Sequence, residues 1–303
     1  MNYTVHQLKV FAKVVQLQSI TKAAEALYLT QPAVSIQLKN FQDQFEIPLT
    51  EVIGRQLYVT DFGRQIVKIV HDILDKLDEI NYKTESFKGI LSGKISLSIV
   101  STGKYIMPYF LSDFLKLHPG VDLQIDVINR AGVIESLENN EVDFGFVSIL
   151  PEKLKVEEEL LMENKLYLVN SAKDDLNANN IFNSSPVLFR EEGSATRMIM
   201  EGFFEANQVS LKKRIVLTSN EAVKQAVIAG LGCSIMPLIG IRNELLNNEI
   251  QIIPYPGLPI KSDWRLIWLI DKQLSPVAKA YLNFVRKNKL EIIHSCFLGM
   301  DKY

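Results

Sequence analysis

The sequence predicts a mainly helical N-terminal domain, then one long helix, and then a C-terminal α/β domain of two lobes. Three observations predict this fold class. Helical patterns and a small hairpin fill residues 1–60, a heptad pattern without proline fills residues 61–89, and strands alternate with helices in residues 90–303. Alternating strands and helices are typical of α/β domains with parallel sheets. The length of 303 residues also favours two or three domains.

Composition and motifs favour a soluble globular protein without a metal site or a membrane span. With 47% hydrophobic and 22% charged residues, the chain has the balance of a soluble globular protein. Its two cysteines and four histidines lack metal-ligand spacing, so we expect no disulfide framework, no zinc site and no cofactor. The N-terminus lacks the segments of a signal peptide, and the apolar run Leu266–Ile270 is too short for a bilayer. We therefore expect a cytoplasmic protein without a membrane partner.

Residues 1–60 contain signals for three short helices. Ser19 is placed to cap the second helix and Thr30 the third, whose first turn holds Gln31 and Pro32. The apolar spacing predicts one buried face on each helix. These faces consist of Leu8, Phe11 and Val15, of Ile20, Ala23, Ala24 and Leu27, and of Val34, Leu38, Phe41 and Phe45. The β-prone stretches around Gly54–Gln56 predict a hairpin, the candidate wing.

Residues 61–89 form one helical pattern in which apolar side chains alternate four and three positions apart. Such a seam is typical of a coiled coil. The alternative is a helix docked on its own domain, but that role needs a wider apolar stripe. We therefore expect a dimerising helix. Its expected contacts are Ile66, Val70, Ile73, Leu77 and Ile80.

After Gly89 and Gly93 the pattern changes to alternating strands and helices. Strands are expected at 95–100, 123–128, 143–147, 166–169, 187–189, 215–217 and 264–270. Helices are expected at 105–116, 133–139, 195–206, 222–229 and 276–287. Two similar series predict two lobes with a cleft between them. The first lobe covers about 90–163 and 268–303, and the second about 164–267.

The stretch Ser19–Lys39 carries the most specific motif in the chain. It contains the pair Ala23–Ala24 and the run Thr30-Gln31-Pro32-Ala33-Val34-Ser35. It resembles the helix-turn-helix of LysR-type transcriptional regulators, and the resemblance continues through Ile47–Leu49 and Val59–Arg64. A winged helix-turn-helix that reads promoter DNA is what this resemblance implies. It also implies RNA polymerase and further copies of the chain, as a homodimer or homotetramer, as partners.

The chemistry of the third helix agrees with the resemblance. Burial of its apolar face turns Ser35 and Lys39 outward and leaves Gln31 and Gln37 at the edges. Glutamine can bind adenine through two hydrogen bonds, whereas lysine suits phosphate. The alternative is a merely solvated helix face. The expected DNA-binding residues are Ser19, Thr30, Gln31, Pro32, Ala33, Ser35, Gln37, Lys39 and Arg55.

Two positions depart from the family pattern. Ile36 stands where many members have arginine, and Thr50–Val52 stands where they have Phe-x-Arg. Up to Thr60 the chain carries five basic and four acidic side chains, a net charge of +1. We therefore expect modest attraction to phosphate, so that several modules must bind together.

The C-terminal region resembles the effector-binding domain of the same family, which has the two-lobed architecture of periplasmic solute-binding proteins. The stretches Ser101–Pro108 and Arg190–Arg197 are similar to the subgroup that regulates carbon-dioxide-fixation operons. The resemblance implies that a small-molecule effector modulates DNA binding or activation.

Residues that follow strands of both lobes are expected to form the effector site. Ser101 and Thr102 lie where a strand passes into a helix, whose unpaired N–H groups favour a small anion. Alternatively, these two residues only cap their helix, and Arg197 only pairs with Glu191 or Glu192. The expected effector-binding residues are Ser101, Thr102, Asn129, Ser148, Arg190, Thr196, Arg197 and Asn220, with Arg130 as a further candidate.

Two other classes of function compete with a regulator. A solute-binding receptor without DNA function would explain the two lobes, but its exported form needs a signal peptide, and it leaves the helix-turn-helix unused. An enzyme is not expected, because the chain has no G-x-S-x-G, no phosphate-binding loop and no supported catalytic set. Cys233 is expected in the core, and Cys296 as an incidental thiol.

Overall fold

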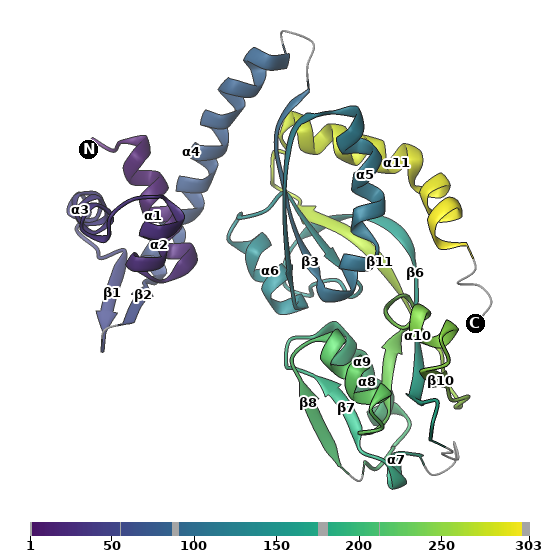
Figure 1. Cartoon of the computed structure of the whole chain (residues 1–303). Coiled ribbons are helices and arrows are strands. Elements are labelled where there is room, and N and C mark those ends of the chain that lie inside the picture. Colours follow the sequence, from purple (N-terminus) through teal and green to yellow (C-terminus); the bar gives the residue numbers. More distant parts are fainter. Residues whose placement is uncertain (1, 55, 87–90, 175–180, 212, 299–303) are drawn as a thin grey trace. The chain divides into compact units, whose positions relative to one another are not determined.

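A computed structural model describes residues 2–54, 56–86, 91–174, 181–211 and 213–298 (Figure 1). The chain divides into two compact units. The first comprises Met1–Gly93 with Asn139–Glu141, and the second comprises Lys94–Glu138 with Val142–Tyr303. The first third of the chain therefore contributes a mainly helical unit, and most of the remainder an α/β unit.

The first unit begins with three helices and a hairpin. They are α1 (Val5–Leu17), α2 (Ile20–Ala26), α3 (Gln31–Gln42), β1 (Thr50–Ile53) and β2 (Gln56–Val59). The predicted caps are present, since the hydroxyl of Ser19 accepts from the Lys22 amide at 3.3 Å and that of Thr30 from the Ala33 amide at 3.4 Å. Pro32 lies in the first turn of α3, where its missing N–H costs no hydrogen bond.

The core of this unit is the one that the apolar spacing predicts. Phe11, Ala23 and Val34 are completely buried, and the Phe11 and Phe41 rings lie 5.0 Å apart. The small side chain at Ala23 lets α2 pack closely on its neighbours. This core fixes the outward face of α3, because the side chains that are not buried must point away from it.

Helix α4 (Asp61–Ser86) follows the hairpin. The first residues of the expected seam pack within the N-terminal unit: Val70 is buried in its core, and Ile66 packs against that core. Further along, Ile73 is 41% exposed and Leu77 is half-buried. The start of α4 is thus docked on its own domain, which is the alternative given above. After Val70 the helix exposes the apolar side chains of Ile73 and Ile80. Dimerisation through the seam stays a prediction.

The second unit is built on a mixed sheet with strand order β10-β6-β11-β5-β3-β4, and β9 pairs with β6. The strands are β3 (Ser92–Val100), β4 (Gly120–Ile128), β5 (Phe144–Val147), β6 (Val156–Ser171), β9 (Ser234–Pro237), β10 (Ile250–Ile252) and β11 (Ile260–Leu269). A parallel pair outside this sheet joins β7 (Val187–Arg190) to β8 (Arg214–Leu217).

Two long antiparallel strands, β6 and β11, pass through both lobes (Figure 1). Their register runs from Ile260 opposite Leu166 to Leu269 opposite Val156, with a shift between Trp264 and Arg265. The expectation of parallel sheets holds for β3–β5 and β7–β8 but is wrong for this pair. The reason is that the chain enters the second lobe along β6 and returns along β11, in the opposite direction.

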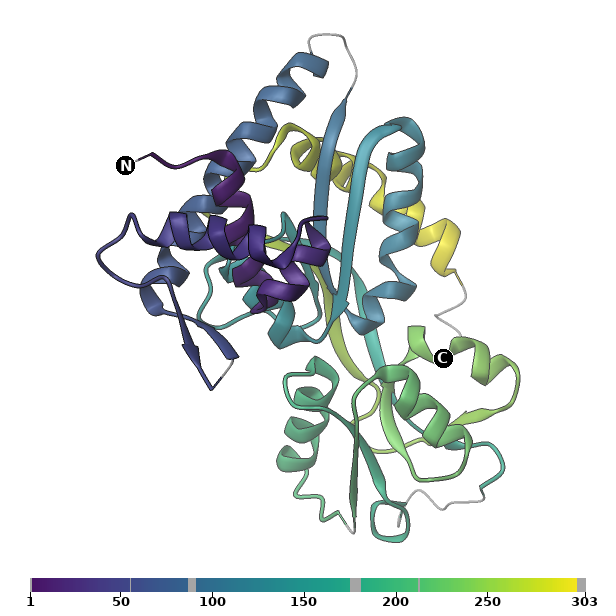
Figure 2. The same ribbon diagram turned by 60° about the vertical axis from the view of Figure 1, so that its left-hand side comes forward.

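Helices cover the sheets of both lobes (Figure 2). In the first lobe they are the 3₁₀ helix η1 (Ser101–Tyr105), α5 (Met107–Leu117), α6 (Arg130–Glu138) and α11 (Pro276–Phe297). In the second lobe they are α7 (Ile181–Ser184), α8 (Ala195–Ala206), α9 (Asn220–Ile228), the 3₁₀ helix η3 (Leu238–Gly240) and α10 (Arg242–Leu246). The helix expected at 105–116 is α5, which begins two residues later with Pro108 in its first turn, and η1 precedes it.

Aromatic packing holds α5 and α11 on the first lobe. Phe114 is completely buried, with its ring 5.2 Å from Tyr281 and 5.6 Å from Phe284. Tyr281 in turn lies 5.9 Å from Phe144 of β5. The core of the lobe thus joins both helices to the sheet that contains β3, the strand that Ser101 follows.

We predict that Phe114→Ala lowers the free energy of unfolding of the second unit by about 3–5 kcal/mol, because the cavity left in a dense core is not refilled. Both tryptophans, Trp264 and Trp268, lie in β11, so tryptophan fluorescence during urea unfolding reports on this unit. Lys116→Ala on the same helix is the control. Its ion pair with Asp113 is exposed, so a change of at most about 0.5 kcal/mol is expected. Equal effects of the two variants would contradict this account of the core.

Candidate functional site

The outward face of α3 carries most of the predicted DNA-binding residues. Gln31, Pro32 and Lys39 are exposed, and Ser35 is half-buried. Among the described residues, no hydrogen bond or ion pair engages the side chains of Gln31, Ser35 or Lys39. Ile36 lies on the same face and is 57% exposed. The surface therefore combines uncommitted polar groups with an apolar centre.

The remaining predicted DNA-binding residues occupy the borders of this face. Gln37 and Ala33 are half-buried on its other flank. Ser19 and Thr30 use their hydroxyls as helix caps, which places them at the N-termini of α2 and α3. Arg55 lies outside the described residues. The first strand of the hairpin ends at Ile53, and Gly54 begins the turn with a φ of +59°, which suits glycine.

A small cavity lies between the lobes of the second unit and brings together seven of the eight predicted effector-binding residues. Its empty space is about 240 Å³, including the open mouth. Its lining residues are Val100, Ser101, Thr102, Asn129, Arg130, Ser148, Arg190, Ser194, Ala195, Thr196 and Asn220. The predicted residues therefore share one site, although they come from distant parts of the sequence.

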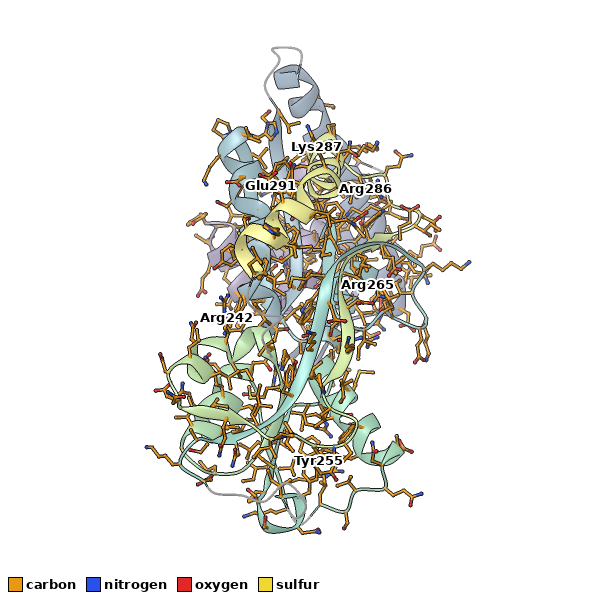
Figure 3. All side chains as sticks on the ribbon, turned by 90° about the vertical axis from the view of Figure 1, so that its right-hand side faces the viewer. Arg242, Tyr255, Arg265, Arg286, Lys287 and Glu291 are labelled. Carbon is orange, nitrogen blue, oxygen red and sulfur yellow. The ribbon has the colours of Figure 1, made fainter. Side chains whose placement is uncertain are left out.

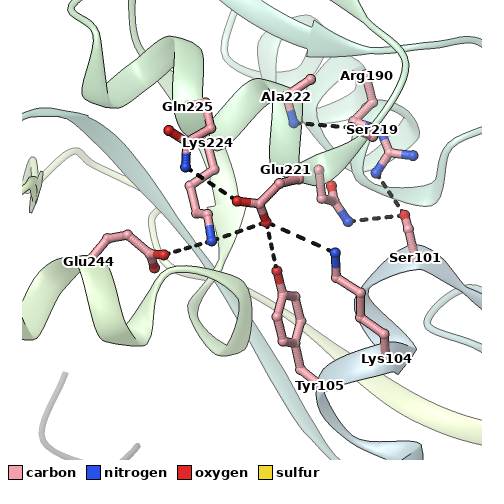
Figure 4. A network of polar contacts seen from close by, with 11 residues as sticks. Ser101, Lys104, Tyr105, Arg190, Ser219, Glu221, Ala222, Lys224, Gln225 and Glu244 are labelled. Atoms are coloured by element: carbon pink, nitrogen blue, oxygen red, sulfur yellow. Dashed lines mark hydrogen bonds and ion pairs between the residues drawn. The ribbon is translucent and has the colours of Figure 1, made fainter.

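Ser101 is the point at which the two lobes exchange hydrogen bonds in this cavity (Figure 4). Its Oγ accepts from Arg190 Nη1 at 3.0 Å and from Asn220 Nδ2 at 3.1 Å. Ser101 opens η1 after β3, Arg190 ends β7, and Asn220 begins α9. Because Ser101 accepts two hydrogen bonds, its own proton is left to donate to a third group.

The cavity is polar and its charges are partly compensated. Arg190 is 4% exposed, and its Nε and Nη2 each lie 2.8 Å from a Glu191 carboxylate oxygen. Arg130 donates to the backbone carbonyls of Ile149 and Leu150 at 2.9 and 2.6 Å. Desolvation by burial lowers the pKa of Arg130 from its usual value. Both guanidinium groups are therefore held in place by the protein.

Helix α8 presents its N-terminus to the same cavity. Ser194, Ala195 and Thr196 line the cavity, and no side chain caps this end of the helix. The first N–H groups of a helix lack partners within it and carry partial positive charge. An anion in the cavity would therefore meet backbone donors as well as side-chain donors.

The structure differs from expectation at Arg197. Its Nε lies 3.0 Å from Glu201 Oε1, one turn along α8, and the residue does not line the cavity. This i,i+4 pairing holds the side chain along the helix surface. Neither Glu191 nor Glu192 is its partner. Sequence reasoning missed Ser194, which the run Gly193-Ser194-Ala195 before a helix could have indicated.

Cys233 lies in the core of the second lobe, as predicted. Burial raises the pKa of its thiol to about 12, so that the reactive thiolate is scarce at neutral pH. Among the described residues, no group of His, Cys, Asp and Glu side chains is placed to hold a metal ion. None of the described helices is long and apolar enough to cross a membrane.

Family models match both units. The model "Bacterial regulatory helix-turn-helix protein, lysR family" covers residues 5–64, and "LysR substrate binding domain" covers residues 88–289. The chain is 35% identical to "HTH-type transcriptional activator CmpR" from Synechocystis sp., over 94% of this chain and 95% of that protein. It is 35% identical to a "RuBisCO operon transcriptional regulator" from Acidithiobacillus ferrooxidans, over 93% of each.

Solved structures agree with these matches. The regulatory domain of CcmR from Synechocystis, determined in complex with 2-PG, is 28% identical with a TM-score of 0.62 and covers 65% of this chain and 98% of that one. Full-length OxyR from Pseudomonas aeruginosa has a TM-score of 0.69 at 19% identity, with 98% and 96% coverage, which shows the fold. The winged helix-turn-helix with a periplasmic-binding-protein-like domain is thus confirmed, and the chain belongs to the LysR family of DNA-binding transcriptional regulators that a small-molecule effector modulates.

Proposed function

We propose that this regulator controls an operon of carbon dioxide fixation and responds to a small phosphorylated or carboxylated anion held at Ser101 between the lobes. The regulators named above are its relatives over nearly the full chain, which supports the target. The hydrogen bonds of Ser101 carry the proposal for the site. CcmR, in complex with 2-PG, supports the class of ligand. The proposal includes a cytoplasmic location, where promoter DNA is found, and RNA polymerase as a partner at the promoter.

The donors around Ser101 suit an anion. Arg190 Nη1 and Asn220 Nδ2 both point at its Oγ, and the Ser101 hydroxyl retains a proton to donate. An anionic oxygen entering here would accept from all three, with the N-terminus of α8 beside it. Such a ligand would contact both lobes at once. It would therefore favour one lobe angle over another, which is the differential affinity that an effector needs.

A solute receptor without DNA function is the alternative proposal. It accounts for the cavity but not for residues 5–64, which match the helix-turn-helix model, nor for the uncommitted polar face of α3. We therefore favour the regulator.

We predict that Thr102→Val and Ser101→Ala each weaken binding of the effector about tenfold, because one hydrogen bond to a charged group is lost. The measurement is calorimetric titration with a panel of small phosphates and carboxylates that includes 2-phosphoglycolate. Arg197→Ala is the matched control, and it should bind like wild type since Arg197 pairs with Glu201. Equal affinity of the wild type and all three variants would show that the effector does not bind in the cavity at Ser101.

On the DNA side, Gln31→Ala or Gln37→Ala should cost about 1–3 kcal/mol per half-site and relax the sequence preference there. Lys39→Ala should weaken all sequences alike and flatten the dependence on salt. Footprinting and gel shifts on an interrupted palindrome from the chain's own promoter measure both effects. Lys116→Ala, in the second unit, is the control. A footprint and affinity unchanged in both glutamine variants would contradict the assignment of α3.

For assembly, we predict that Leu77→Asp yields monomers and abolishes DNA binding, since an unpaired charge in an apolar seam is costly to bury. Gln65→Asp, at an exposed position of the same helix, is the control and should leave the oligomer intact. Light scattering reports the mass, from which dimer and tetramer are also distinguished. A stable oligomer of Leu77→Asp with wild-type affinity for DNA would rule out the seam.

A further inference from the structure

A second cavity lies in the same unit, with about 510 Å³ of empty space including its open mouth. Its walls come from η1, α5 and the end of α11 in the first lobe, and from α9, η3 and α10 in the second. The lining residues are Tyr105, Tyr109, Lys224, Ile239, Gly240, Arg242, Asn243, Glu244, Cys296 and Phe297. Figure 3 shows Arg242 where the ribbons of the two lobes meet. None of these residues lines the cavity at Ser101.

The cationic groups of this second cavity differ in how they are compensated. Lys224 Nζ lies 3.1 Å from Glu221 Oε2 and 2.6 Å from Glu244 Oε1, so its charge is neutralised within the protein (Figure 4). Arg242 is half-buried, and among the described residues no carboxylate or other acceptor engages its guanidinium. A half-buried guanidinium that none of the described acceptors engages favours an anionic ligand, because its five N–H donors are otherwise left to water.

The opposite wall of the cavity is aromatic. Tyr109 and Phe297 pack edge to face with ring centroids 5.2 Å apart. Tyr105 is held by its hydroxyl, which donates to Glu221 Oε2 at 3.3 Å, and by Lys104, whose Nζ lies 5.0 Å from the ring centroid. Rings fixed in this way offer flat apolar surface to a flat ligand at little cost in side-chain entropy.

From this combination we infer that the second cavity is a binding site for a small aromatic anion, with Arg242 holding the anionic group and the rings of Tyr105, Tyr109 and Phe297 holding the planar body. This site is separate from the proposed effector site and does not depend on it. The empty space, which includes the open mouth, leaves room for a ligand of one or two rings.

The two cavities are connected through shared elements (Figure 4). Ser101 and Tyr105 lie at opposite ends of η1, and Asn220 and Lys224 lie one turn apart on α9. A ligand beside Tyr105 and Lys224 therefore acts on the same two elements that position Ser101 and Asn220. Binding at one cavity should alter affinity at the other by an equal factor in both directions.

The test uses phenyl phosphate and phenylacetate as probes, with inorganic phosphate as a probe of charge alone and phenethylamine as a probe of the ring with the opposite charge. Ligand-observed NMR on the full chain detects binding near a Kd of about 1 mM. We expect both aromatic anions to bind, and inorganic phosphate and phenethylamine to bind at least tenfold more weakly.

Gly240 allows the cavity to be blocked. A Cβ built there meets Tyr105 Cε2 at 3.5 Å, an ordinary contact, so alanine is tolerated while a larger side chain fills the space. Gly240→Leu should abolish binding of the aromatic anions, and Gly240→Ala is its matched control. Arg242→Gln should weaken binding about tenfold, whereas Lys287→Gln, an exposed lysine on α11, should leave it unchanged.

Several outcomes would overturn the inference. They are no binding of either aromatic anion to the wild-type chain, equal binding to Gly240→Leu and Gly240→Ala, or no effect of Arg242→Gln. Thr102→Val separates this inference from the proposed effector site. Loss of probe binding in Thr102→Val with retention in Gly240→Leu would place the probe at Ser101 and refute the second site. Urea unfolding followed by tryptophan fluorescence shows which variants fold, and the Arg242 variant carries the test if Gly240→Leu does not.

Discussion

The antiparallel pairing of β6 with β11 is the contact on which the arrangement of the two lobes depends. The two strands pair from Leu166 opposite Ile260 to Val156 opposite Leu269, with one shift of register on the way. The register shift beside Trp264 lies where the strands leave one lobe for the other, and bulges of this kind bend and twist a strand locally. The hydrogen bonds of Ser101 to Arg190 and Asn220 join the same two lobes away from these strands.

Polar side-chain contacts between the lobes help to set the angle between them. Ser101 receives Arg190 and Asn220 across one cavity, while Tyr105 contacts Glu221 beside the other. Each is a polar contact between groups that water could also satisfy, so each contributes modestly to stability. Their sum is small enough that a ligand of ordinary affinity can shift the balance between lobe angles. The geometry thus favours a sensor that responds to small molecules without unfolding.

Local signals predicted the first unit well. The caps Ser19 and Thr30, the proline in α3 and the spacing of Val34 and Leu38 all act within one turn of a helix, so the sequence pattern contains them. The full length of β6 was not predicted, because Glu157–Glu159 interrupt the apolar alternation although the strand continues by pairing with β11. Likewise, the sequence places both Thr196 and Arg197 at the start of α8, and the i,i+4 spacing of Arg197 and Glu201 on that expected helix could have indicated the ion pair that the structure shows.

The weak positive charge of the N-terminal unit has a consequence inside the cell. Affinity for DNA falls with salt in proportion to the number of phosphates that a protein neutralises. Here the net charge up to Thr60 is +1, and the exposed Ile36 occupies the face of α3 in place of a cation. Each module that neutralises few phosphates should add little to the salt dependence of DNA binding. The response to an effector would then depend less on the ionic strength around the DNA.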